Sequence, residues 1–280
     1  MVFLRSKIVK NESYSYLVKS KWNPKRKTSE QQTIKYLGKT SDITLDDIPD
    51  EYRNDSSILL FFLSNNQLDI KKREKYLVKT RQNMRKFLLA GDLKNAMIIC
   101  TDFVKQSSVA NFYDVILRPA MYQIGELWDA KKLDVGDEHI ASNTAMRLIE
   151  SIGTKPKTKS KGKTILICTP DGEYHAIPCF MMETYLSLNG YNIINLAPSA
   201  PSNSIMSHIS EKNPDLILIS VTLKEHLRSC ERLVKNLKKF KIPIIVGGQA
   251  LENENRFDNV RSLDDGGMSK LSKMIKEEIR

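Results

Sequence analysis

A chain of 280 residues with 41% hydrophobic content is long enough to bury the cores of two compact domains. Its longest strongly apolar run, Ile58 to Leu63, is too short to cross a bilayer, and residues 1–10 lack the apolar core of a signal peptide. The four cysteines are scattered, without metal-ligand spacing or a secretory framework, so we expect reduced thiols in a cytoplasmic protein with no membrane role.

Positive charge is concentrated at the start of the chain. The net charge is +11, and residues 1–40 hold an excess of +8, from ten Lys or Arg and two Glu. A local excess of this kind favours a polyanionic partner such as DNA, because neutralising phosphates releases counterions. The alternative interpretation is a solvated, solubilising surface.

Residues 1–54 are predicted to form a small β-rich segment. Three strands are expected, at Val2–Val9, Ser13–Lys19 and Gln32–Leu37. The basic loop Lys21–Lys27 follows the second strand, where a twisted sheet could present it to a DNA groove or to a partner protein. The acidic stretch Ser41–Asp55 then predicts a domain boundary.

Residues 55–153 are predicted to form a four-helix bundle. Apolar residues recur at three and four positions through this region, with few β-branched runs. One helix is expected to end at Gly91, and Asp92 can cap the next. Two later helices are expected at Asn111–Ala130, bent or interrupted at Pro119, and at Val135–Ile152.

The last part of the chain, residues 164–280, is predicted to be a doubly wound, flavodoxin-like parallel sheet. It follows a lysine-rich linker, Thr154–Lys163, that has no apolar periodicity. Strands are expected at Thr164–Cys168, Tyr191–Leu196, Leu216–Ser220 and Ile242–Val246, alternating with helix-length segments. Because ligands of such sheets bind at the carboxyl ends of the strands, the residues that follow each strand are the candidates for a site.

A histidine follows the first of these strands. His175 lies at the end of a flexible loop, where one imidazole can coordinate a metal centre, and Glu173 can hydrogen-bond the other ring nitrogen. By itself, a histidine near a helix start is more often a cap or a surface residue.

Small and hydroxyl residues follow two further strands. They are Ser220, Val221 and Thr222 after the third strand, and Gly247 and Gly248 after the fourth. Alone, such residues are also typical of turns and helix caps.

The segment Gly172-Glu173-Tyr174-His175 resembles the Glu-x-His-x-x-Gly signature of cobalamin-binding domains, with Pro178 in place of the final glycine. The resemblance implies that His175 is the lower axial ligand to cobalt and that Gly172 belongs to the same loop. It also implies that Ser220, Val221 and Thr222, together with Gly247 and Gly248, lie along the displaced nucleotide tail of cobalamin.

In the helical region, Trp128 is followed after nine residues by Glu138 and His139. This spacing resembles the cap domain of adenosylcobalamin-dependent transcriptional regulators, including light-sensing repressors of the MerR type. The resemblance implies that these three side chains face the upper axial group. It covers residues 75–280, and the basic β-rich segment stands where those regulators carry a winged helix. Without the resemblance, Trp128 would be a bundle-core residue.

Three functions remain open at this point. The first is a cobalamin sensor that regulates transcription, reads adenosylcobalamin more readily than methylcobalamin, responds to light, and acts through DNA and a change of homo-oligomer. The second is a corrinoid carrier for a methyltransferase. The third is an adaptor that has lost its cofactor, which Pro178 keeps open.

Overall fold

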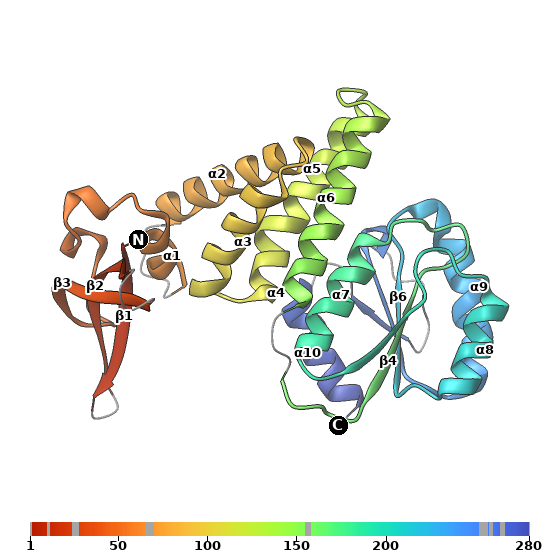
Figure 1. The fold of residues 1–280 in the computed structure, drawn as a ribbon. Coiled ribbons are helices and arrows are strands. Elements are labelled where there is room, and N and C mark those ends of the chain that lie inside the picture. Colours follow the sequence, from red (N-terminus) through yellow and green to blue (C-terminus); the bar gives the residue numbers. More distant parts are fainter. Residues whose placement is uncertain are drawn as a thin grey trace. The chain divides into compact units, whose positions relative to one another are not determined.

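The computed structural model describes residues 2–9, 12–23, 28–64, 70–154, 158–251, 257, 260–263 and 267–279 (Figure 1). The chain divides into two compact units, which are described separately. The first unit contains residues 1–86 and 94–120, and the second contains residues 87–93 and 121–280.

The first unit begins with a three-stranded antiparallel sheet in the order β1-β2-β3. Its strands are β1 (Val2–Val9), β2 (Glu12–Asn23) and β3 (Thr28–Lys39), and the last two are longer than predicted. Leu4 and Leu17 pair across β1 and β2 and are buried, at 5% and 0% exposure, so they anchor one face of the sheet. Most of the predicted basic loop, from residue 24 to 27, lies outside the described residues.

The acidic stretch after β3 is folded into this unit rather than extended. It forms two short 3-10 turns, Leu45–Asp47 and Asp50–Tyr52, and buries Ile43 and Ile48. Arg53 stabilises the segment by donating from Nε to the carbonyl oxygen of Ile48 at 2.7 Å. A domain boundary at residues 54 and 55 therefore stays a prediction.

Within the described residues, the helical region contains six α-helices and is interrupted by a π-helical turn shortly before Pro119. The helices are α1 (Ser56–Ser64), α2 (Ile70–Leu89), α3 (Leu93–Gln106), α4 (Val109–Phe112), α5 (Arg118–Asp129) and α6 (Val135–Gly153). A π-helical turn, Tyr113–Leu117, joins α4 to α5. Pro119 has no N–H to donate to the carbonyl oxygen of Val115, and Arg81 donates to that oxygen instead, from Nε at 2.6 Å.

The second unit contains a five-stranded parallel sheet in the order β5-β4-β6-β7-β8. Its strands are β4 (Thr164–Cys168), β5 (Asn192–Asn195), β6 (Leu216–Ser220), β7 (Ile244–Gly247) and β8 (Arg261–Leu263). Numbered within the sheet, this order is 2-1-3-4-5, the flavodoxin-like order that the sequence predicts. The edge strand β8 was not predicted, because its three residues contain no buried apolar run.

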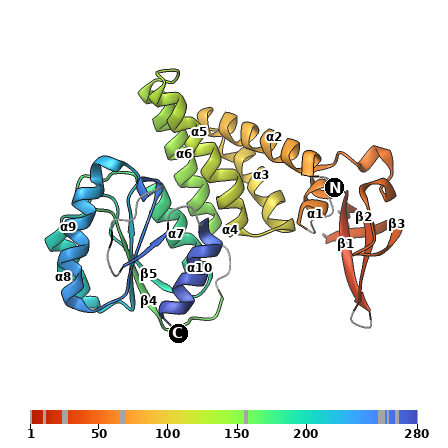
Figure 2. The same cartoon turned by 180° about the vertical axis from the view of Figure 1, so that it is seen from behind.

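Helices cover both faces of this sheet, as Figures 1 and 2 show. They are α7 (Ile177–Leu188), α8 (Ser202–Lys212), α9 (Leu227–Leu237) and α10 (Gly267–Glu278), with α7 and α10 on one face and α8 and α9 on the other. Helix α6 packs against α7, which joins the end of the helical region to the sheet. Among the described helices, none is long and apolar enough to span a membrane.

Candidate cofactor-binding site

The candidate site lies at the switch point of the parallel sheet. Strands β4 and β6 are neighbours, while the chain leaves β4 toward β5 and leaves β6 toward β7. The loops that follow two such strands diverge and leave a crevice at their carboxyl ends. The loop after β4 carries Glu173 and His175, and the loop after β6 carries Thr222 and Leu223.

The backbone of the histidine loop is held from the end of β5. Ser199 donates its N–H to the Glu173 carbonyl at 3.1 Å, and its hydroxyl oxygen accepts the Gly172 N–H at 2.9 Å. Thr169, at the end of β4, donates its hydroxyl to the same Glu173 carbonyl at 3.0 Å. Gly172 has φ of +88°, a conformation that favours glycine. These hydrogen bonds hold the backbone of the loop in place without a ligand.

The carboxylate of Glu173 is fully buried and accepts four hydrogen bonds. Oε1 accepts from the backbone N–H and the ring Nδ1 of His175, at 3.1 and 2.5 Å. Oε2 accepts from the backbone N–H groups of Thr222 and Leu223, at 2.8 and 3.1 Å. Burial raises the pKa of Glu173, but the bonds from His175, Leu223 and Thr222 outweigh it and lower the pKa to about 2.

His175 presents one ring nitrogen to this carboxylate and leaves the other for a ligand. The hydrogen bond and charge of Glu173 raise the pKa of His175, and Glu138 and Glu225 raise it further, against the effect of burial. With Nδ1 on Glu173, Nε2 is the ring nitrogen that can coordinate a metal, on a side chain that is 49% exposed. This is the donor arrangement expected of a lower axial imidazole.

The backbone after β7, at Gly248, closely approaches the backbone after β6, at Val221. A side chain on Gly248, whose φ is +130°, would place its Cβ 2.0 Å from the Val221 carbonyl oxygen, so only glycine fits there. Val221 is fully buried, and its carbonyl accepts the Ala250 N–H at 3.3 Å. Ser220 is buried, while Gly247 is partly exposed at the end of β7.

The three cap residues lie in the same unit as His175. Trp128 lies in the last turn of α5 and is 47% exposed, although tryptophan in a helical bundle is usually buried. Glu138 holds His139 through Oε2 and Nδ1, 2.9 Å apart, and also accepts a hydrogen bond from the Ser142 hydroxyl. The charge of Glu138 raises the pKa of His175, so Glu138 lies near enough to the histidine loop to act on it electrostatically.

The sequence predicted the histidine loop and its Glu173–His175 hydrogen bond but missed part of the support for this loop. Ser199 and the Leu223 N–H were not predicted, although applying the strand-end rule to β5 as well would have pointed to Ser199. His226 lies in a 3-10 turn, and a Cβ on Gly172 would meet its ring at 3.3 Å. Pro178 lies in the first turn of α7, where its missing N–H breaks no helical hydrogen bond.

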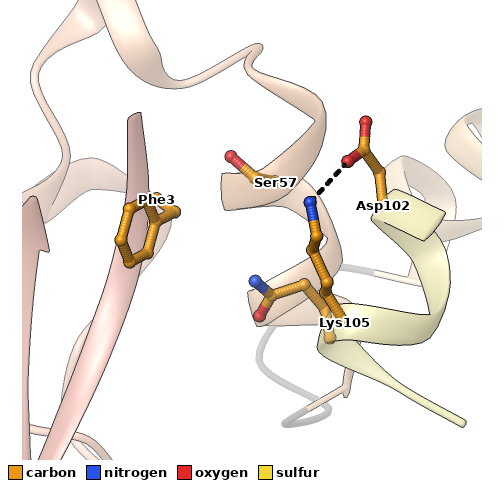
Figure 3. A pocket seen from close by; sticks show the side chains of 5 residues that line it. Phe3, Ser57, Asp102 and Lys105 are labelled. Carbon is orange, nitrogen blue, oxygen red and sulfur yellow. Dashed lines mark hydrogen bonds and ion pairs between the residues drawn. The ribbon is translucent and has the colours of Figure 1, made fainter. Parts of the chain in front are cut away.

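A separate hollow of about 180 Å³ lies in the first unit, lined by Phe3, Ser57, Asp102, Lys105 and Gln106 (Figure 3). On one wall of the hollow, Lys105 donates to Asp102 of the same helix at 3.4 Å. Pockets for drug-sized ligands occupy roughly 300–1,000 Å³. This hollow is therefore too small for a large cofactor.

An anchored imidazole at the switch point of a parallel sheet, beside exposed cap side chains, defines a protein that binds a large metal-containing cofactor. Residues 163–268 match a family model described as a B12 binding domain, and residues 80–152 match a second model with the same description. Both matches support cobalamin binding by this chain.

The relatives have more than one function. The methanol corrinoid protein of Methanosarcina barkeri is 26% identical over 109 residues, which cover 38% of this chain and 40% of that protein. The HTH-type transcriptional repressor CarH of Myxococcus xanthus is 23% identical over 142 residues, which cover 49% and 47%. Each match spans less than half of the relative's length.

Among solved structures, the monomethylamine corrinoid protein of Methanosarcina barkeri matches with a TM-score of 0.56 at 13% identity. The match covers 71% of this chain and 98% of that one. At this identity, the likeness shows a shared fold.

Proposed function

We propose that this cobalamin-binding protein is a sensor that regulates transcription and that adenosylcobalamin is its ligand. The observation that carries the proposal is the proximity of Glu138 to His175, whose pKa it raises. In this proposal, the histidine loop and a cap group made of Trp128, Glu138 and His139 flank the bound cofactor. A carrier of small methyl groups has less need of an exposed indole there than a sensor of a bulky upper group.

Each residue has a distinct task in this proposal. His175 coordinates the cofactor through Nε2, and Glu173 holds the Nδ1–H tautomer in place. Ser220, Thr222, Gly247 and Gly248 border the nucleotide tail, and Val221 positions them from the core. When bound, cobalamin supplies a cobalt ion with an exchangeable upper group. The cap group would pack against that upper group, so the contacts of the cap would differ between cofactor forms that carry different upper groups.

The proposed output is DNA binding through residues 1–40, in a cytoplasmic protein that changes its homo-oligomeric state. The excess of +8 in these residues supports a polyanionic partner. The part of the chain without a counterpart in the monomethylamine corrinoid protein leaves room for such an added function.

The test is to load the purified chain with adenosylcobalamin in the dark and to record its absorption spectrum and DNA affinity before and after illumination. We expect a spectrum typical of histidine ligation, a change on illumination, and a change in DNA affinity or oligomeric state. Protein loaded with hydroxocobalamin is the control. Equal affinity for the two cofactor forms, with no response of DNA binding, would contradict the sensor.

The second candidate is a corrinoid carrier in methyl transfer. The observation that favours it is the match to 98% of the monomethylamine corrinoid protein. Methyl transfer from a methylamine or methanol, measured with a purified methyltransferase subunit, would establish it. Failure to bind any cobalamin would favour the third function, an adaptor that has lost its cofactor.

A further inference from the structure

Three tyrosines form a continuous strip on one face of the N-terminal sheet. Tyr14 and Tyr16 are two residues apart on β2, so their side chains leave the same face, and Tyr16 pairs with Tyr36 of β3. The ring centroids of Tyr16 and Tyr36 are 5.1 Å apart, and those of Tyr14 and Tyr36 are 6.5 Å apart. We refer to Tyr14, Tyr16 and Tyr36 as the tyrosine face.

The tyrosine face is not part of the core of this unit. Leu4 and Leu17, which hold the sheet to the rest of the unit, leave its opposite face and are almost completely buried. Tyr36 is 54% exposed, whereas large aromatic rings usually bury most of their surface. Tyr14 and Tyr16 are partly buried, so the exposed ring of Tyr36 is the one that packing within the unit does not explain.

Cations lie beside these rings. Arg5 pairs with Tyr16, and Lys7 pairs with Tyr14, so both cations leave the same face as the tyrosines, and both are exposed. Lys39 of β3, the strand on the opposite side of β2 from β1, also pairs with Tyr14. Its charge is offset by Glu12, whose Oε1 is 2.7 Å from the Lys39 Nζ. Arg5 and Lys7 thus give the face its net positive charge.

We infer that the tyrosine face binds single-stranded nucleic acid, with bases stacked on the rings and phosphates along Arg5 and Lys7. The inference rests on the proposed nucleic-acid partner of residues 1–40 and assigns that partner a surface and a strandedness. Aromatic rings stack on unpaired bases of any sequence, and neighbouring cations follow the backbone. In a duplex the base faces are covered by their neighbours, so the rings would find only base edges.

The experiment measures fluorescence anisotropy of a labelled oligonucleotide of mixed sequence, as a single strand and as a duplex, with the full chain. The single strand is expected to bind more tightly. Tyr36→Ala should weaken its binding by roughly fivefold to a hundredfold, as removal of a stacking ring does, and Tyr36→Phe should stay within about twofold. Tyr122→Ala is the matched control, because it removes an exposed ring from α5 instead of the sheet.

A second measurement separates the face from general charge. Arg5→Ala and Lys7→Ala should each flatten the slope of log affinity against log salt by about 0.7. Lys35 is the matched cation, since it pairs with Leu17 on the opposite face and donates to the Asp47 carbonyl. Lys35→Ala should change the slope less than either.

Three results would overturn the inference: duplex bound as tightly as single strand, equal slopes for all three cation variants, or no nucleic-acid affinity at low salt. If circular dichroism shows that Tyr36→Ala unfolds the sheet, the Tyr36→Phe variant and the cation variants still test the inference. Binding of the single strand by cofactor-free protein, with no response to adenosylcobalamin, would support the tyrosine face and contradict the sensor.

Discussion

Two of the Glu–His pairs in the second unit, Glu173–His175 and Glu138–His139, use the same chemistry in opposite surroundings. In the histidine loop, Glu173 is fully buried and accepts four hydrogen bonds from two loops. In the cap group, Glu138 and His139 are neighbours on α6, and the His139 side chain is 68% exposed. The first pair is held by the fold and the second by its own helix.

The difference separates rigid positioning from adaptability. A buried carboxylate with every oxygen engaged fixes the imidazole of His175 before a ligand arrives, at the cost of strong dependence on each partner. An exposed pair on one helix can change rotamers cheaply, and can therefore respond to different upper groups. The comparison predicts that mutations in the histidine loop have large effects and that mutations in the cap group have selective ones.

The largest effect is expected from His175→Ala. The change removes the candidate metal ligand, so it should abolish the histidine-ligated absorption spectrum and most cobalamin retention while the apo protein still folds. Spectra and gel-filtration retention after loading with hydroxocobalamin measure this, and His208→Ala on α8 is the control. An unchanged spectrum would remove His175 from the site.

The next effect is expected from Glu173→Gln, which keeps the shape of the side chain and removes its charge. An amide nitrogen would then meet N–H donors, so unfolding should become easier by about 1–3 kcal/mol. Cofactor affinity should fall by roughly tenfold to a hundredfold, as it does when the partner of a ligating histidine is lost. Chemical denaturation and spectral titration measure the two effects.

Glu183→Gln is the matched control for that variant. Glu183 accepts a hydrogen bond from Asn195 at 2.7 Å, which a glutamine oxygen can also accept. Equal losses in the two variants would mean that Glu173 has no special part in holding the imidazole.

A selective effect is expected from Trp128→Ala. The indole is half exposed, so its removal should change stability little and leave hydroxocobalamin affinity within about twofold. Preference for adenosylcobalamin should fall by about tenfold, because the loss of aromatic packing affects the bulkiest upper group most. Competitive titration of the two forms measures the preference, and Trp128→Phe should restore part of it. Equal losses for both forms would show a purely structural tryptophan.

The smallest effect is expected from Glu138→Gln. The site is partly exposed, so stability should change by no more than about 0.5 kcal/mol, and the lower-ligand spectrum should persist. In the cofactor-free protein, the pKa of His175 should stay raised by Glu173 but move slightly lower, since Glu138 also raises it. Titration by nuclear magnetic resonance measures this shift. A large loss of stability would contradict the contrast between the two pairs.

Much of the second unit was predictable because its signals are local. Continuous apolar strands such as Leu216–Ser220 predicted a buried parallel sheet, and the flavodoxin-like order is confirmed. His175 and Glu173 were predictable because they are two residues apart in one loop. The tasks assigned to His175, to the cap residues and to the residues at the ends of β6 and β7 remain predictions.

The rest depended on contacts between distant residues. The Thr222 and Leu223 N–H groups reach Glu173 through backbone, which no side-chain pattern reveals. In the first unit, Arg81 donates to the Val115 carbonyl oxygen, which Pro119 cannot reach with an N–H. The sequence predicted an interrupted or bent helix at Pro119, but not the residue that bonds this carbonyl. Strand β8 is short and partly exposed, so it carries no hydrophobic signature.

The hydrogen bond from Leu223 to Glu173 joins residues 50 positions apart in the chain. Contacts at such separation form late in folding, because the intervening chain must first give up its loop-closure entropy. The orientation of the imidazole is therefore completed only once β6 has docked beside β4. During synthesis, a chain that has not yet emerged past Leu223 contains His175 but lacks the two N–H donors that hold Glu173. We therefore expect the proposed ligand to be oriented only after β6 has formed.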